Sequence, residues 1–376
     1  MKNTAIYIHI PFCDHKCIYC DFYSIITSDN ISSYKTALLK EIDHYANIYT
    51  HERNITSIYF GGGTPSLMEP QYLNEIITSI KDNFNVNESA EISMETNPGT
   101  VSKDKLKEFR NAGINRISIG IQSFNEDELK FLTRIHDKDT AIKTVHHAAN
   151  SGFTNISIDL IFNLPGQTKD IWLNNLRFAA SLPVNHISAY SLILERGTIL
   201  NKMVLDGKVK IQDEDYDADL YEMTIDFMEA NGFMQYEVSN FAKPGFECIH
   251  NNAYWRYQDY LSFGTSAHSF IDGKRWWNYS SLKLYITQIN AKGFAEANHE
   301  LISAEQSINE YTMLALRSFG LDIPDLKERF GKSWLVKNSQ YLRLLEEKGM
   351  LVKNGSFLKL TKHGYAVCDE IIAKFI

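Results

Sequence analysis

The stretch HIPFCDHKCIYCDFYS, residues 9–24, decides the fold class, because it sets three of the chain's five cysteines within eight positions. Cys13, Cys17 and Cys20 follow a short apolar run, in a loop that begins near Pro11. Thiolate sulfur is a soft ligand that suits iron–sulfur clusters, and three thiolates hold three corners of such a cluster. The fourth iron then lacks a protein ligand, so a small molecule can chelate it. The spacing C-x3-C-x2-C therefore predicts a metal site.

Two alternatives remain open for this loop. A zinc site usually needs four ligands, and His9 or His15 would complete the set. Three unligated thiols are the other alternative, although clustered cysteines in a reducing compartment usually mark a metal or redox site. The odd cysteine count argues against a disulfide framework. We expect Cys248 to be structural and Cys368, which falls in an apolar helical pattern, to lie in a core.

The composition is that of an ordinary globular protein. The chain has 376 residues, 44% hydrophobic and 22% charged, with a formal charge of −8. The acidic balance gives no global field for nucleic acid or anionic lipid. The first residues lack the layout of a signal peptide, and no apolar run approaches the roughly 20 residues that span a bilayer. We therefore expect a cytoplasmic protein, with a peripheral position at the inner face of a membrane as the further option.

Strand and helix patterns alternate along the first 240 residues. Short runs rich in Ile, Tyr and Phe, most ending in Gly, Pro, Asn or Ser, occur at 5–12, 57–65, 90–98, 116–124, 155–165 and 186–194. Helical periodicity lies between them, as at 33–49 and 72–84. Six such units predict an open, partial (β/α)6 barrel of the TIM type, with its chemistry at the carboxyl ends of the strands.

The remaining chain divides into two parts. Residues 241–302 are rich in aromatics, His, Gly and Asn, and we expect an irregular connecting segment that covers the barrel mouth. Residues 303–376 read as helices with a hairpin at 350–361, in which Asn354-Gly355 predicts a type I′ turn. This pattern predicts a winged-helix-like α+β domain. The expected domains are thus 1–240, 241–302 and 303–376.

Several motifs carry a resemblance to a known family. They are the cysteine loop, IYIHIPFC at 6–13, FGGGTPS at 60–66, GIQSF at 120–124 followed by LTRIH, and IDLIFNLPGQT at 158–168. The chain resembles the radical S-adenosylmethionine (SAM) superfamily, and within it the oxygen-independent coproporphyrinogen III oxidase group, which includes the HemW heme chaperones. The likeness covers most of the chain, including the tail. It implies a [4Fe–4S] cluster on Cys13, Cys17 and Cys20, with SAM chelating the open iron.

The same resemblance implies a set of SAM-binding residues at the strand ends: Tyr7, Gly62, Gly63, Thr64, Glu95, Gln122, Arg134 and Asp159. The residue types suit the ligand, because glycines allow close backbone approach and a guanidinium binds a carboxylate in two places. Buried acids and amides in apolar strands also need partners. Purely structural roles are the alternatives to SAM binding. They are an ordinary glycine turn, a local cap or a hydrogen bond to a neighbouring strand for the polar groups, and a surface salt bridge for the arginine.

Two features select the branch of the family. The decarboxylating enzymes carry a fourth cysteine two positions after the third, and this chain has Phe22 there. HNNAYW, residues 250–255, matches the HNxxYW motif of HemW, which implies that His250 binds heme. A neutral imidazole is a good axial ligand, Tyr254 and Trp255 offer flat faces to a porphyrin, and Asn251 would orient the ring. The alternative is a histidine that only packs in an aromatic loop.

The favoured function is a heme chaperone that binds heme, a [4Fe–4S] cluster and SAM, and delivers heme to apo-hemoproteins such as respiratory enzymes. An electron donor is an expected partner, the oligomeric state is a monomer or homodimer, and no catalytic residue is assigned. The second hypothesis is oxidative decarboxylation of coproporphyrinogen III. The third is a zinc-stabilised regulator that binds DNA through its wing, but the acidic chain shows no basic stripe, so we expect no nucleic-acid partner. His268, in the loop FGTSAHSF, is either a second heme ligand or part of a structural turn. For Cys248, a thiolate ligand to heme is the alternative to a structural role.

Overall fold

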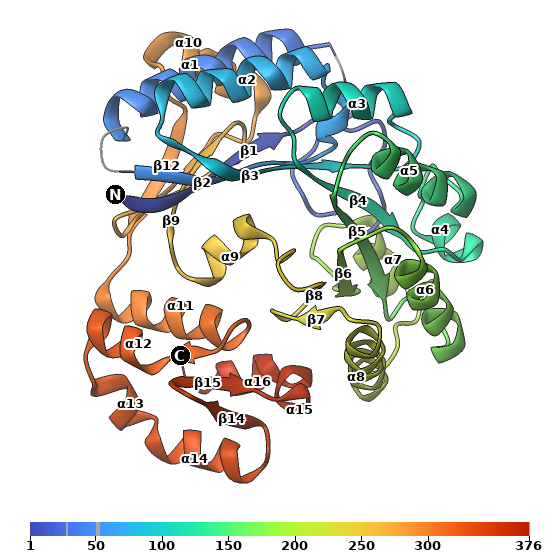
Figure 1. The fold of residues 1–376 in the computed structure, drawn as a ribbon, viewed down its shortest axis with the longest axis vertical. Coiled ribbons are helices and arrows are strands. Elements are labelled where there is room, and N and C mark those ends of the chain that lie inside the picture. Colours follow the sequence, from blue (N-terminus) through green and yellow to red (C-terminus); the bar gives the residue numbers. More distant parts are fainter. Residues whose placement is uncertain (28, 50–52, 376) are drawn as a thin grey trace.

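Six parallel strands form one curved sheet in sequence order in the computed structural model, which describes residues 1–27, 29–49 and 53–375 (Figure 1). The strands are β1 (Lys2–Ile10), β2 (Arg53–Gly62), β3 (Val86–Thr96), β4 (Arg116–Gln122), β5 (Asn155–Phe162) and β6 (His186–Ser191). Each falls on one of the six predicted runs. The prediction of a partial (β/α)6 barrel is therefore confirmed.

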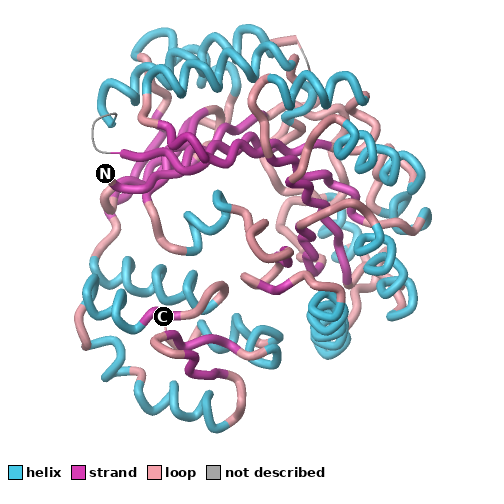
Figure 2. Tube along the Cα trace, viewed as in Figure 1, coloured by secondary structure: helices cyan, strands magenta, loops and turns pink. Residues whose placement is uncertain are grey.

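Helices cover the outer face of this sheet (Figure 2). They are α1 (Ile31–Tyr49), α2 (Pro70–Asn83), α3 (Lys103–Asn111), α4 (Glu126–Phe131), α5 (Lys138–Asn150) and α6 (Lys169–Ser181), with a short 3₁₀ turn, η2 (Pro65–Leu67). Several begin at a side-chain cap, as where Thr168 accepts a hydrogen bond from the N–H of Ile171 at 3.2 Å. These caps and the apolar stripe on each helix explain why the sequence pattern located them.

Alternation along β1 shows how the strands separate core from site. Ile6, Ile8 and Ile10 are fully buried in the core between sheet and helices. Tyr7 and His9 point to the opposite face, inside the barrel, where they line a cavity. The hydroxyl of Tyr7 lies 3.1 Å from Nδ1 of His9, as their shared face predicts. On β1, the inner face is thus polar and aromatic, and the outer face is aliphatic.

The chain after β6 extends the sheet at both edges, so residues 241–302 are more regular than the irregular cover that we expected. It contains α7 (Ile199–Leu205), α8 (Glu214–Ala230), β7 (Met234–Gln235), β8 (Asn240–Ala242), α9 (Ile249–Trp255), β9 (Asp259–Phe263), β10 (His268–Ile271), β11 (Lys274–Asn278), α10 (Leu282–Lys292) and β12 (Glu296–Leu301). β8 and β7 follow β6, whereas β9 pairs in parallel with β1 and β10–β12 continue from it. Only α9 lies inside the barrel (Figure 1).

Two buried polar anchors hold this added part. Arg53 at the start of β2 forms an ion pair of 2.5 Å with Asp259. On α1, the buried carboxylate of Glu41 accepts hydrogen bonds from Gly264 N at 2.9 Å, Asn278 Nδ2 at 2.6 Å and the Tyr285 hydroxyl at 2.6 Å. Buried carboxylates require such partners. These contacts join segments more than 200 positions apart, so no local sequence pattern predicts them.

The C-terminal unit has its own hydrophobic core and a small antiparallel sheet in the order β13-β15-β14. Its elements are α11 (Ala304–Leu316), β13 (Leu321–Asp322), α12 (Ile323–Phe330), α13 (Ser333–Lys337), α14 (Ser339–Glu347), β14 (Leu351–Asn354), β15 (Phe357–Leu360), α15 (Lys362–Ala366) and α16 (Cys368–Ile372). Cys368 is buried there, as predicted. The hairpin turn is shifted by one residue: Asn354 pairs with Phe357, so Gly355 and Ser356 form the loop.

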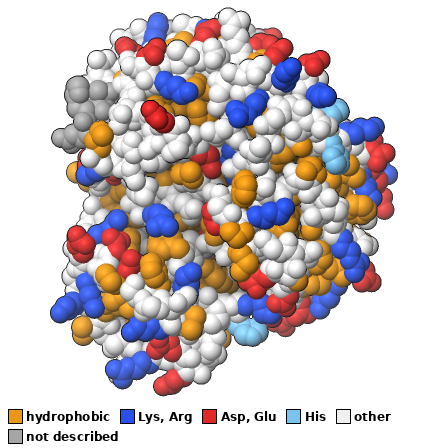
Figure 3. Space-filling view, in the orientation of Figure 1, with side chains coloured by type: hydrophobic (Ala, Val, Ile, Leu, Met, Phe, Trp, Pro, Cys, Tyr) orange, Lys and Arg blue, Asp and Glu red, His pale blue; other side chains and the backbone are white. Residues whose placement is uncertain are grey.

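The surface carries both signs of charge. Basic and acidic side chains are interspersed over the face drawn in Figure 3.

Within the described part of the chain, no helix has the length and apolar character that a membrane span requires.

Candidate functional site

The loop after β1 holds the three clustered cysteines beside the glycine-rich end of β2. Gly63 N donates to Ile10 O and Thr64 N donates to Phe12 O, both at 2.7 Å, so the two segments run together. Cys13 N also donates to Ile25 O at 3.0 Å, which closes the loop at its far end. The thiols of Cys13, Cys17 and Cys20 are free and partly exposed.

The donor set fits an iron–sulfur cluster better than a single ion. His9 uses both ring nitrogens in contacts with Tyr7 and Tyr23, and His15 Nε2 lies 3.2 Å from Thr133 Oγ1. Neither histidine therefore completes a zinc site in this arrangement. Three soft thiols on one loop remain the characteristic donor set of a cluster.

Three successive glycines end β2 where side chains would collide with the site. A Cβ on Gly62, which has φ of +111°, would lie 2.6 Å from the ring of His9. A Cβ on Gly63 would lie 2.6 Å from Phe12 O and 3.0 Å from Cys13 Sγ. The backbone can approach the cluster loop this closely only because these positions lack side chains.

Glu95 places a buried carboxylate next to these glycines. It accepts hydrogen bonds from the Tyr59 hydroxyl at 2.8 Å and from Gly62 N at 3.2 Å. Burial raises the pKa of Glu95 to about 7, and the nearby Asp159 adds to the shift. A cationic group brought to this carboxylate would favour its ionised form, so the position suits an ammonium.

Arg134 links the cluster loop to the ends of β3 and β4. Its Nη1 lies 3.4 Å from Cys17 Sγ, and its Nη2 donates to Asn97 Oδ1 at 2.7 Å and to Gly120 O at 2.6 Å. Asn97 also donates to Thr64 Oγ1 at 3.0 Å. Arg134 thus belongs to a hydrogen-bond network within the site, and the alternative of a surface salt bridge does not apply. Asn97, which was not among the predicted site residues, hydrogen-bonds to two of them, Arg134 and Thr64.

The other two predicted SAM residues lie on neighbouring strands. Gln122 ends β4 with φ of +71°, a conformation that is strained for a residue with a side chain. Asp159 on β5 accepts from Ser118 Oγ at 3.1 Å, and burial raises the pKa of its carboxyl. Tyr7 lies on β1 and Glu95 on β3, so all four groups lie in the carboxyl-terminal halves of strands of the same sheet.

His250 lies deep inside the barrel on α9. Its Nδ1 is 3.0 Å from Ser57 Oγ and its Nε2 is 3.0 Å from the Tyr254 hydroxyl. The ring stacks on Tyr59 with centroids 4.8 Å apart, and burial lowers its pKa to about 3. Ser57 and Tyr254 therefore hold the ring, where we expected Asn251 to do so. Both nitrogens are engaged, so neither is open to iron in this arrangement.

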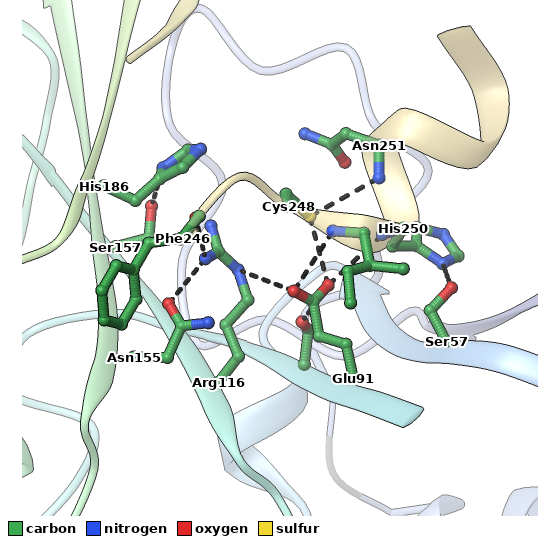
Figure 4. Close-up of polar contacts among 12 residues, drawn as sticks. Ser57, Glu91, Arg116, Asn155, Ser157, His186, Phe246, Cys248, His250 and Asn251 are labelled. Atoms are coloured by element: carbon green, nitrogen blue, oxygen red, sulfur yellow. Dashed lines mark hydrogen bonds and ion pairs between the residues drawn. The ribbon is translucent and has the colours of Figure 1, made fainter. Parts of the chain in front are cut away.

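A buried ion pair anchors α9 in this position (Figure 4). Glu91 accepts hydrogen bonds from Cys248 Sγ at 3.4 Å, Ile249 N at 3.2 Å and His250 N at 3.3 Å. Arg116 Nε lies 4.0 Å from the same carboxylate. Cys248 is buried and accepts from Asn251 N at 3.5 Å, so it caps the helix. This confirms the structural role that we predicted for Cys248.

An open cleft of about 280 Å³ lies beside β1, next to these groups. Aromatic and imidazole side chains line much of it, including Tyr7, His9, Phe22, Tyr254, Tyr260 and His268. Phe22 is 64% exposed, although it follows Cys20 by only two positions. The cleft therefore adjoins both the cysteine loop and the strand ends that carry Tyr7 and Gly62.

The barrel and the three-cysteine loop define a radical SAM protein. The model of the Radical SAM superfamily matches residues 7–179, and that of the HemN C-terminal domain matches residues 302–367. Heme chaperone HemW of Bacillus subtilis is 36% identical over 100% of this chain and 99% of its own length. HemW of Lactococcus lactis is 32% identical over 100% and 98%. The chain belongs to the HemW family of heme chaperones.

A solved structure supports the radical SAM fold. Coproporphyrinogen III oxidase (HemN) of Escherichia coli, a radical SAM enzyme, superimposes with a TM-score of 0.84 at 25% identity, covering 100% of this chain and 90% of that one. Membership of the superfamily implies a [4Fe–4S] cluster and SAM as cofactors. The relatives from Bacillus subtilis and Lactococcus lactis, both matched over full length, are named as heme chaperones, so the oxidase alternative is not favoured.

Proposed function

We propose that this protein binds heme and passes it to apo-hemoproteins, using the radical SAM scaffold as its framework. The observation that carries the proposal is the aromatic cleft, which is bounded by Tyr254 of the HNxxYW motif and by Phe22 beside the cysteine loop. Aromatic faces in an open cleft suit a flat, largely apolar macrocycle. Respiratory enzymes are the proposed recipients, and the proposed location is the cytoplasm, including the inner face of the membrane.

In this proposal Cys13, Cys17 and Cys20 hold the cluster, and SAM occupies the adjoining strand ends. Glu95 accepts from the ammonium of SAM, and Arg134 faces its carboxylate. The remaining SAM contacts come from the predicted residues Tyr7, Gly62, Gly63, Thr64, Gln122 and Asp159. When bound, the cluster would supply one-electron chemistry at SAM, and this would require an external electron donor.

His250 supports heme binding from beneath the cleft. Its ring is buried and bonded to the Tyr254 hydroxyl, and Tyr254 lines the cleft. Removing the imidazole would therefore release Tyr254 as well as empty the space against Tyr59. The HNxxYW motif would act in this way even where its histidine does not reach the iron.

The test is a hemin titration of anaerobically reconstituted protein, with iron and sulfide measured on the same sample. We expect saturable binding at one heme per chain, and about fivefold weaker binding in His250→Ala, which corresponds to the loss of one hydrogen bond. Wild-type protein that shows no saturable Soret change would refute the proposal. Sustained formation of protoporphyrinogen with SAM and a reductant would instead support the decarboxylase.

A further inference from the structure

Three histidines lie in or under the cleft. Their hydrogen bonds differ in whether one ring nitrogen keeps a lone pair that is free to bind a metal. His9 Nε2 is 2.9 Å from Tyr23 O, and its Nδ1 is 3.1 Å from the Tyr7 hydroxyl. His250 contacts Ser57 and Tyr254 through its two nitrogens. An imidazole can bind iron only through a nitrogen with a free lone pair. Neither of these rings offers one without first breaking a buried hydrogen bond.

His268 is arranged differently. It is exposed at the start of β10, lines the cleft, and has its Nδ1 3.0 Å from Ser266 O. A carbonyl oxygen only accepts, so Nδ1 carries the proton and Nε2 carries the lone pair. Nε2 has no hydrogen-bond partner among the described residues. A backbone carbonyl on one nitrogen with the other left open is the usual arrangement of a metal-binding histidine.

The ring of His268 is also held in place. It stacks on Trp277 with centroids 5.6 Å apart and planes at 25°. Trp277 lies directly opposite His268 in the pairing of β10 with β11. The stack and the hydrogen bond to Ser266 together restrict the ring, so less freedom is lost when it binds a ligand.

We propose that Nε2 of His268 is the axial ligand of the heme iron in this cleft, and that His250 is a positioning residue that acts through Tyr254. The inference rests on the proposed function, because it assigns the iron ligand of the same site. The ligand class is an iron porphyrin, docked against Phe22, Tyr254 and Tyr260.

The other groups of the cleft favour this assignment. Burial raises the pKa of Tyr7, Tyr23, Tyr254 and Tyr260, so these phenols stay protonated and are poor ligands for iron. The described residues that line the cleft include no carboxylate that would repel heme propionates. The volume of about 280 Å³ is at the small end of ligand pockets, so a porphyrin would remain partly outside. Partial exposure suits a protein that must release its heme.

The experiment compares wild type, His268→Ala, His250→Ala and the control His146→Ala in the reconstituted full chain. His146 is an exposed histidine on α5 that does not line the cleft. Hemin affinity is read from difference titrations, and iron ligation from electron paramagnetic resonance and resonance Raman spectra of the ferric heme. Imidazole is then added to His268→Ala.

We expect His268→Ala to bind hemin at least about tenfold more weakly, to lose the histidine ligation signature, and to regain it with imidazole. His250→Ala should keep the wild-type ligation with about fivefold weaker binding, and His146→Ala should match wild type. Unchanged ligation in His268→Ala, or loss of the histidine signature in His250→Ala alone, overturns the inference but leaves heme binding intact. Wild type without saturable binding overturns both.

Discussion

Replacing Gly62 with alanine tests two reasons for a glycine at the end of β2. One is the lack of space for a side chain, and the other is the positive φ. Gly62 has φ of +111°, and an added Cβ would lie 2.6 Å from the ring of His9, which contacts Tyr7 and Tyr23. A positive φ costs a residue with a side chain about 1–2 kcal/mol. Forcing a methyl group into a packed site costs about 1–3 kcal/mol more. We therefore expect Gly62→Ala to lower the free energy of unfolding by about 2–5 kcal/mol.

The matched control is Gly166→Ala. Gly166 has φ of +77°, and nothing described lies within 4 Å of its Cβ position, so it carries the backbone cost alone, about 1–2 kcal/mol. Urea denaturation of both variants and wild type measures the difference, and iron and sulfide per chain show whether displacing His9 disturbs the cysteine loop. The reasoning fails if the two variants lose the same free energy and retain the same amount of iron.

Two further predictions concern charge. Arg134→Lys should raise the dissociation constant of SAM at least about tenfold, because one ammonium cannot replace the guanidinium contacts, which include Cys17; calorimetry on reconstituted protein measures this, and an unchanged constant would contradict the proposed role. Burial raises the pKa of Glu41 from 4.5 to about 7, so the folded state holds this proton more tightly than the unfolded state and loses stability as the pH rises between those values. The unfolding free energy of wild type minus that of Glu41→Gln should therefore fall by up to about 3 kcal/mol from pH 5 to pH 8. A value that rises with pH would refute the assigned cause.

The sequence predicted the parallel barrel and the location of its site because both depend on local patterns. Alternation in β1 puts Ile6 and Ile8 on one face and Tyr7 on the other, and a βα repeat leaves little choice of topology. The cysteines follow the first strand, so their place at the carboxyl edge follows from the fold class. The SAM-binding roles of the neighbouring residues stay predictions.

What the sequence did not predict depends on contacts between distant segments. The strands after residue 258 join the sheet through pairs such as Arg53 with Asp259. The local sequence around either residue does not predict this pairing. The ring of His250 faces Ser57 across 193 positions, so the motif alone gives its chemistry but not its burial. The cleft that includes His268 likewise combines residues of β1, the cysteine loop, α9 and the segment from β9 to β10.

The position of β1 has a consequence for biogenesis. Thr4 in β1 pairs with Asp259 in β9, so one edge of β1 lacks its partner until some 255 further residues have been synthesised. At roughly 5–20 residues per second this takes on the order of ten to fifty seconds, during which the nascent strand and the thiols that follow it stay accessible. An open strand edge invites wrong pairing, so the ribosome-bound chain is the stage at which a holdase would be most effective.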